Sequence, residues 1–108
     1  MINLLEEERE IAENAKMKMK ADFDPSSSKI HFELNMMGNV KKTIFNIPTM
    51  GVFMDSMGNL QGIEEDPAEG FKFTMDLLTS LRDSGDLIEE YPPGVLKTLM
   101  DVFGPFLT

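Results

Sequence analysis

Hydrophobic and polar positions change their period along the chain, and the period predicts the type of each element. Leu4, Leu5 and Ile11 fit three- and four-residue spacing, which is typical of an amphipathic helix over residues 2–14. From Lys16 onward, lysines alternate with apolar residues, and strict alternation predicts a strand with one solvent-facing side. We expect strands at residues 16–23, 29–37, 40–47, 50–57 and 60–63.

Charge and turn composition predict how these strands pair. If residues 25–28 form a loop, Asp24 faces Lys29 and Phe23 faces Ile30. A slip of one residue would instead set charged positions against apolar ones along the whole hairpin. Further two-residue turns are expected at residues 38–39, 48–49 and 58–59.

Two helices are expected in the C-terminal part of the chain. Asp66 is a suitable N-cap for a helix over residues 67–84, and Gly85 is a suitable C-terminal cap. Apolar periodicity predicts a last helix over residues 93–103. A helix, an antiparallel four- to five-stranded meander and two further helices predict a single α+β domain over residues 1–108, with the helices on one sheet face.

The predicted register also places apolar side chains on the sheet face that points away from the helices. Ile44 would face Phe53 there, so we expect Phe53→Asp to abolish partner binding and leave the fold intact. The alternative is that a helix covers these residues. The predicted apolar patch consists of Met37, Val40, Ile44, Phe53, Met57 and Leu60.

Composition excludes several classes of site. The 108 residues include no cysteine and one histidine, which excludes disulfides, thiolate ligands, a cysteine nucleophile and any pair of imidazoles within one chain. No apolar run approaches the roughly 18 residues of a membrane-spanning helix. The acidic start of the chain is unlike a signal peptide. We therefore expect a reducing, cytoplasmic setting and no membrane partner.

The formal net charge of −9 bears on the choice of partner. An acidic chain repels nucleic acid, so we expect no direct nucleic-acid binding. The acidity either keeps the chain soluble or contacts the basic surface of a protein. If it contacts a protein, the candidate residues are Glu64, Glu65, Asp66, Glu69, Asp86, Glu89 and Glu90.

Candidate catalytic and metal-binding groups have simpler interpretations. His31 is expected opposite Asp22 as a cross-strand pair on the surface rather than as a catalytic dyad. The segment that begins at Asp55 lacks the ligand spacing of a calcium loop, and the acids near Asp66 fit a helix N-terminus. No phosphate-binding or dinucleotide motif is present. The sequence thus predicts no catalytic residues, no metal and no cofactor.

The leading hypothesis is a small, non-enzymatic protein-binding module, such as an adaptor, a chaperone-like subunit or an inhibitor of the kind made by phages. It would bind its partner through the apolar patch. A second hypothesis is an acidic mimic of nucleic acid that inhibits a DNA- or RNA-handling protein, with salt-sensitive binding. A third hypothesis is self-assembly into a homo-oligomer.

Overall fold

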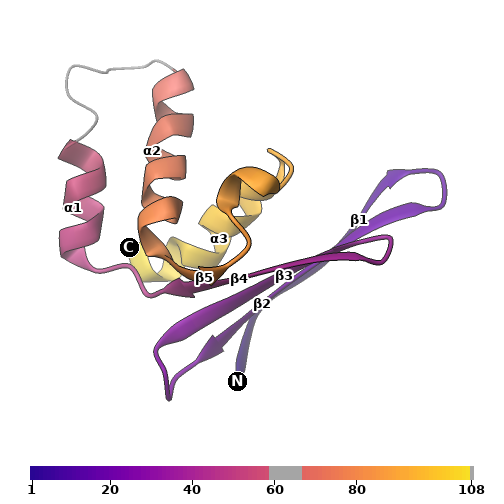
Figure 1. The fold of residues 1–108 in the computed structure, drawn as a ribbon, viewed down its shortest axis with the longest axis horizontal. Helices are drawn as coiled ribbons and strands as arrows, with labels where there is room; N and C mark the ends of the chain where they lie inside the picture. Colours follow the sequence, from indigo (N-terminus) through magenta and orange to yellow (C-terminus); the bar gives the residue numbers. More distant parts are fainter. Residues whose placement is uncertain (59–66, 108) are drawn as a thin grey trace.

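A computed structural model describes residues 1–58 and 67–107, and in these ranges it contains a five-stranded antiparallel sheet and three α-helices (Figure 1). The strands lie in the sheet in the order of the sequence. The predicted α+β class with an antiparallel sheet is therefore confirmed. In chain order the elements are β1 (Ile2–Ala12), β2 (Ala15–Asp24), β3 (Lys29–Met36), β4 (Asn39–Asn46), α1 (Met50–Gly58), α2 (Pro67–Leu81), β5 (Arg82–Gly85), the 3-10 turn η1 (Ile88–Glu90) and α3 (Val95–Leu107).

The N-terminal segment is a strand, so the prediction of a helix over residues 2–14 is wrong. A bulge between Asn3 and Leu5 allows the neighbouring Leu4 and Leu5 both to pack against the core. Two adjacent apolar residues break the alternation expected of a strand, which is why the segment fitted a helical pattern. Glu8 of β1 stands opposite Lys18 of β2. Opposite charges on paired strands stabilise the hairpin, and this partner strand overrides the helical propensity of the acidic segment.

The predicted register of the hairpin formed by β2 and β3 is confirmed. Asp24 faces Lys29, and Phe23 faces Ile30. The loop between these strands is held by Asp24, whose carboxylate accepts hydrogen bonds from the amide and the hydroxyl of Ser26. These bonds lower the pKa of Asp24. Charge and turn chemistry were thus sufficient to predict this hairpin.

The next turn lies one residue earlier than the sequence predicts. Met36 faces Asn39, so the turn residues are Met37 and Gly38. Both have positive φ angles, 53° and 90°, as a type I′ turn requires. The Asn35 side chain accepts a hydrogen bond from the amide of Gly38, with 3.0 Å between nitrogen and oxygen. The sequence favoured a Gly-Asn turn, and this side-chain contact favours the shifted register.

Residues 50–57 form helix α1, so the predicted strand there is wrong. Thr49 caps the helix, because its hydroxyl oxygen accepts the amide of Val52 and its carbonyl accepts the amide of Phe53. A threonine before a run of apolar residues is a sequence signal for a helix start, but residues 48–49 were assigned to a turn. The predicted strand at residues 60–63 lies outside the described residues.

The predicted C-terminal helices are confirmed in position and corrected at their ends. The helix expected over residues 67–84 ends at Leu81, and the chain continues as β5 along the edge of β4. Gly85 lies in that strand, where a Cβ atom would come within 2.9 Å of the Thr43 Cα. The last helix runs to Leu107 rather than to residue 103, with Pro105 in its final turn. Strand pairing, which the sequence does not reveal, ended α2 early.

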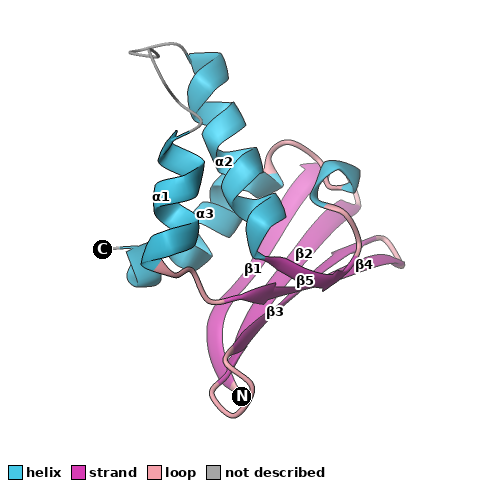
Figure 2. Cartoon of the chain, turned by 60° about the vertical axis from the view of Figure 1, so that its left-hand side comes forward, coloured by secondary structure: helices cyan, strands magenta, loops and turns pink. Residues whose placement is uncertain are grey.

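The hydrophobic core lies between one face of the sheet and the helices (Figure 2). Alternate side chains of β2 and β3 point into it, as the period of two predicts. The sheet contributes Met17, Met19, Ala21, Ile30, Phe32, Leu34 and Phe45, and the helical layer contributes Leu77, Leu78, Leu81, Ile88, Tyr91, Val95, Leu99, Val102 and Phe103.

A short chain of hydrogen bonds joins the helical layer to the sheet inside this core. The buried Thr43 hydroxyl donates to the carbonyl of Asp86, at 2.7 Å. Its single proton is then engaged, so the Tyr91 hydroxyl donates to the Thr43 oxygen, at 2.8 Å. Burial raises the pKa of Tyr91 above its ordinary value of 10.0. The hydroxyls of Thr43 and Tyr91 are thus both hydrogen-bonded inside the core.

Candidate functional site

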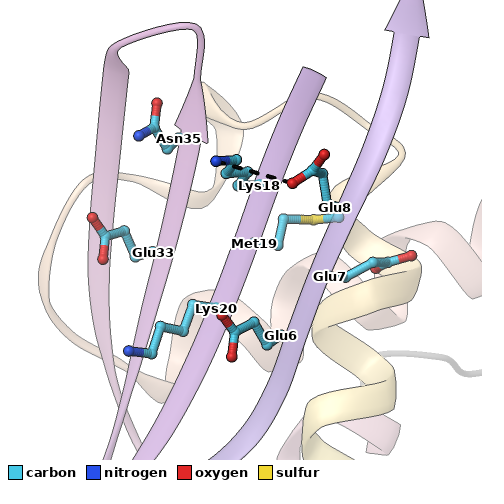
Figure 3. A pocket seen from close by; sticks show the side chains of 8 residues that line it. All are labelled: Glu6, Glu7, Glu8, Lys18, Met19, Lys20, Glu33 and Asn35. Atoms are coloured by element: carbon cyan, nitrogen blue, oxygen red, sulfur yellow. Dashed lines mark ion pairs between the residues drawn. The ribbon is translucent and has the colours of Figure 1, made fainter.

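The sheet face that points away from the helices carries a charged groove of about 380 Å³ (Figure 3). Glutamates of β1 and lysines of β2 form neighbouring rows along it, and β3 supplies Glu33 and Asn35. Glu7 and Met19 also border the groove, although Met19 is buried in the core on the other face. The other side chains that line the groove are Glu6, Glu8, Lys18 and Lys20.

Some charges of this groove are paired with charged side chains of β1 and β2. The Lys16 ammonium lies 3.1 Å from one Glu8 carboxylate oxygen, and the Lys18 ammonium lies 4.0 Å from the other. The hydrogen bond from Lys16 lowers the pKa of Glu8. Lys20 contacts Asp22 at 3.7 Å. The groove lining contains four glutamates and two lysines, and exposed ion pairs of this kind contribute little to stability.

The sheet residues of the predicted apolar patch lie apart from its other members. Met37 is at the tip of the hairpin between β3 and β4 and is 70% exposed. Val40 and Ile44 lie on β4, on the face that points away from the core. Ile44 stands opposite His31. His31 also stands opposite Asp22 of β2, and this second pairing is the predicted one. Two isolated aliphatic side chains among charged ones do not form a continuous apolar surface.

Phe53 and Met57 of the predicted patch belong to α1 rather than to the sheet. Phe53 is half-buried and packs edge-to-face on Phe73 of α2, with 5.8 Å between ring centroids. Because this contact joins α1 to α2, Phe53→Asp would also disturb the fold. Met57 lies on the exposed side of α1. Leu60 lies outside the described residues.

Several of the predicted acidic contact residues have structural roles. Asp86 extends the pairing of β4, because its carboxylate accepts the amide of Lys42 and its own amide donates to the Lys42 carbonyl, both at 2.8 Å. The Glu90 carboxylate accepts the amide of Leu87 and closes η1. Glu89 is exposed. Glu64, Glu65 and Asp66 lie outside the described residues, as does the side chain of Glu69.

Within residues 1–58 and 67–107, no cluster of three or more histidine, aspartate or glutamate side chains is placed to hold a metal ion. In the same ranges, none of the helices combines the length and the apolar character needed to cross a membrane.

Sequence reasoning missed an apolar ridge on α1. Met50, Met54 and Met57 are 79%, 63% and 51% exposed, and their i, i+4, i+7 spacing places them on one side of the helix. The opposite side faces the protein, because Val52 packs against the core and Ser56 is 2% exposed. We call the three methionines the methionine ridge. Their spacing was visible in the sequence, but the strand assignment concealed it.

Helix α1 lies at the outside of the helical layer, beside α2 (Figures 1 and 2). The C-terminal half of the chain, to which α1 belongs, carries nearly all of the net charge in its sequence. Residues 1–49 contain eight acids and seven bases, whereas residues 50–108 contain eleven acids and three bases, so the net charges are −1 and −8. Within residues 50–81 the count is six acids and one base, Lys72. The methionine ridge therefore belongs to the strongly acidic part of the chain.

Comparison of this chain with protein-family models, with curated proteins and with solved structures finds no match.

Proposed function

We propose that this chain is a small, non-enzymatic protein-binding module that docks a partner on the methionine ridge of α1. The observation that carries the proposal is the exposure of three methionines along one side of a helix whose other side is packed. Methionine is flexible and polarizable, and it is common on surfaces that adapt to their partners. The proposal keeps the predicted class of function and moves the docking surface from the sheet to α1.

The shape of the ridge favours a helical partner. Side chains at i, i+4 and i+7 form a row that fits between the rows of a second helix. Met50 and Met57 are about 10 Å apart along the helix axis, given a rise of about 1.5 Å per residue. Two or three apolar side chains of a partner helix are enough to cover that length.

The charge of this part of the sequence favours a basic partner. Asp55 is exposed on α1 itself, and the sequence from residue 50 to residue 81 contains six acids and one base. Lysine or arginine residues beside the partner's apolar face would be attracted, and glutamates there would be repelled. The proposed ligand is therefore an amphipathic helical segment with basic flanks.

Two synthetic peptides of about 15–18 residues, long enough to form a helix, test this proposal. Both carry the same leucine face, with lysines beside it in one peptide and glutamates in the other. We expect the lysine peptide to bind more tightly by calorimetry. Met54→Asp should weaken its binding at least about tenfold, because burial of one methionine side chain contributes about 1.5–3 kcal/mol.

Met37→Asp is the matched control, because Met37 is 70% exposed and Met54 is 63% exposed. It lies on the sheet hairpin and should change the affinity less than about twofold. Equal binding of the two peptides, or equal losses from the two substitutions, would rule out the ridge as the docking surface.

The segregation of charge keeps the nucleic-acid mimic as the second candidate. A mimic would bind a lysine peptide that lacks the leucine face, and this binding would vanish near 1 M salt, where the Debye length is about 3 Å.

Sedimentation across a concentration series tests the third candidate, which is self-assembly. Self-assembly through the ridge would raise the measured mass, and Met54→Asp would prevent it.

A further inference from the structure

We propose that the methionine ridge is also a modification site, at which oxidation by hydrogen peroxide switches docking off. This inference rests on the proposed function for its effect on binding. The oxidation itself depends only on the exposure of the thioethers.

Solvent access separates the methionines of this chain into groups. Met50, Met54 and Met57 are more than half exposed, whereas Met17 and Met19 are 4% and 1% exposed in the core. Peroxide must reach the sulfur atom, so the ridge methionines should react under conditions that leave the core methionines reduced. Met1 and Met37 are also exposed and should react, but they lie outside α1.

In the reaction, the thioether sulfur attacks one oxygen of hydrogen peroxide. A sulfur–oxygen bond forms, the oxygen–oxygen bond breaks, and the second oxygen leaves as water after a proton transfer. Methionine is oxidised by two electrons to the sulfoxide, and the peroxide is reduced by the same two electrons. A dithiol-dependent sulfoxide reductase reverses the change, because its two thiols become a disulfide while the sulfoxide oxygen leaves as water.

The modification should affect binding without affecting the fold. A sulfoxide is polar, and an apolar partner face offers it no hydrogen-bond donor, so its burial on docking is unfavourable. None of the three ridge methionines belongs to the core or to the side chains packed against it. Oxidation of the ridge should therefore leave the unfolding temperature nearly unchanged.

Limited peroxide treatment of the intact chain, followed by peptide mapping by mass spectrometry and by calorimetry with the lysine peptide, tests the switch. We expect sulfoxide at the ridge and not at Met17 or Met19, together with an affinity loss of at least about tenfold. Treatment with two sulfoxide reductases, one for each sulfoxide epimer, and a dithiol should restore binding.

Leucine variants provide the matched controls. M50L/M54L/M57L retains an apolar ridge, so it should bind the peptide and remain insensitive to peroxide. M37L should stay as sensitive as the unmodified chain. Loss of binding by the oxidised triple variant, or undiminished binding by the oxidised unmodified chain, would overturn the switch alone. Failure of the unoxidised chain to bind would overturn both the docking surface and the switch.

Discussion

At the scale of single residues, backbone conformation sets what several side chains contribute to stability. Met37 has a φ angle of 53° in the turn between β3 and β4, a region that only glycine and asparagine visit readily. Its side chain is 70% exposed, so little packing depends on it. The turn conformation, rather than packing in the core, therefore sets what Met37 contributes to stability.

Met37→Asn should therefore stabilise the protein by about 1 kcal/mol, because Asn-Gly is a preferred type I′ turn. Chemical denaturation monitored by circular dichroism measures this change. A decrease in stability would mean that packing of the Met37 side chain stabilises the protein more than its exposure indicates.

At Gly85 a substitution should destabilise the protein, because the backbone of this residue approaches β4 closely. Its φ angle is 94°, and a Cβ atom there would crowd the Thr43 Cα at 2.9 Å. Gly85→Ala should cost about 3 kcal/mol, measured as a fall in the free energy of unfolding.

Gly51→Ala is the control for this substitution, because the nearest atom to its Cβ would be 4.0 Å away. Gly51 lies in α1, where alanine should stabilise by about 0.5–1 kcal/mol. Equal effects at the two glycines would contradict the close approach at Gly85.

At the scale of elements, local signals decided some segments and partner strands decided others. The β2–β3 hairpin follows from alternation and charge, and its register is the predicted one. Segment 2–14 had the opposite outcome, because its lysine-bearing partner strand outweighed its helical composition. Segment 50–57 was mistaken because short apolar runs fit a strand and a buried helix equally well.

Thr49 offers a test of the helical assignment of α1. Thr49→Ala removes the oxygen that accepts the Val52 amide and should cost about 1 kcal/mol, whereas Thr49→Asp should preserve the cap. Denaturation curves of the two variants measure the difference. If alanine were as stable as aspartate, the cap would contribute nothing to α1.

At the scale of the whole molecule, the Tyr91 hydrogen bond couples the helical layer to the sheet. Burial raises the pKa of Tyr91 in the folded state above 10.0, so the folded protein retains this proton longer than the unfolded chain does. The stability that this difference contributes is present in full below pH 10 and is lost as the pH rises through the folded-state pKa.

We therefore expect the free energy of unfolding to decrease above about pH 10, as measured by denaturation across a pH series. Tyr91→Phe should cost about 1 kcal/mol near neutral pH, because Thr43 loses its donor. The variant should also show a shallower alkaline decrease. An identical slope would assign the alkaline loss to other groups.

The acidity of the molecule is likewise a property of the whole chain. Residues 1–49 contain nearly equal numbers of acids and bases and have a net charge of −1. The excess of −8 lies in residues 50–108. A partner with a basic surface should therefore be attracted to the C-terminal half of the chain rather than to strands β1 to β4.

Local features of the sequence were sufficient to predict the α+β class, the β2–β3 register, the positions of α2 and α3 and the absence of cysteine chemistry. These features depend on local periodicity, turn residues and composition. Contacts between elements decided that residues 2–12 form a strand, that α2 ends where β5 pairs with β4, and that Phe53 faces α2. Each of these outcomes depends on a partner outside the segment itself, whose stabilisation outweighs the weak local preference of the segment.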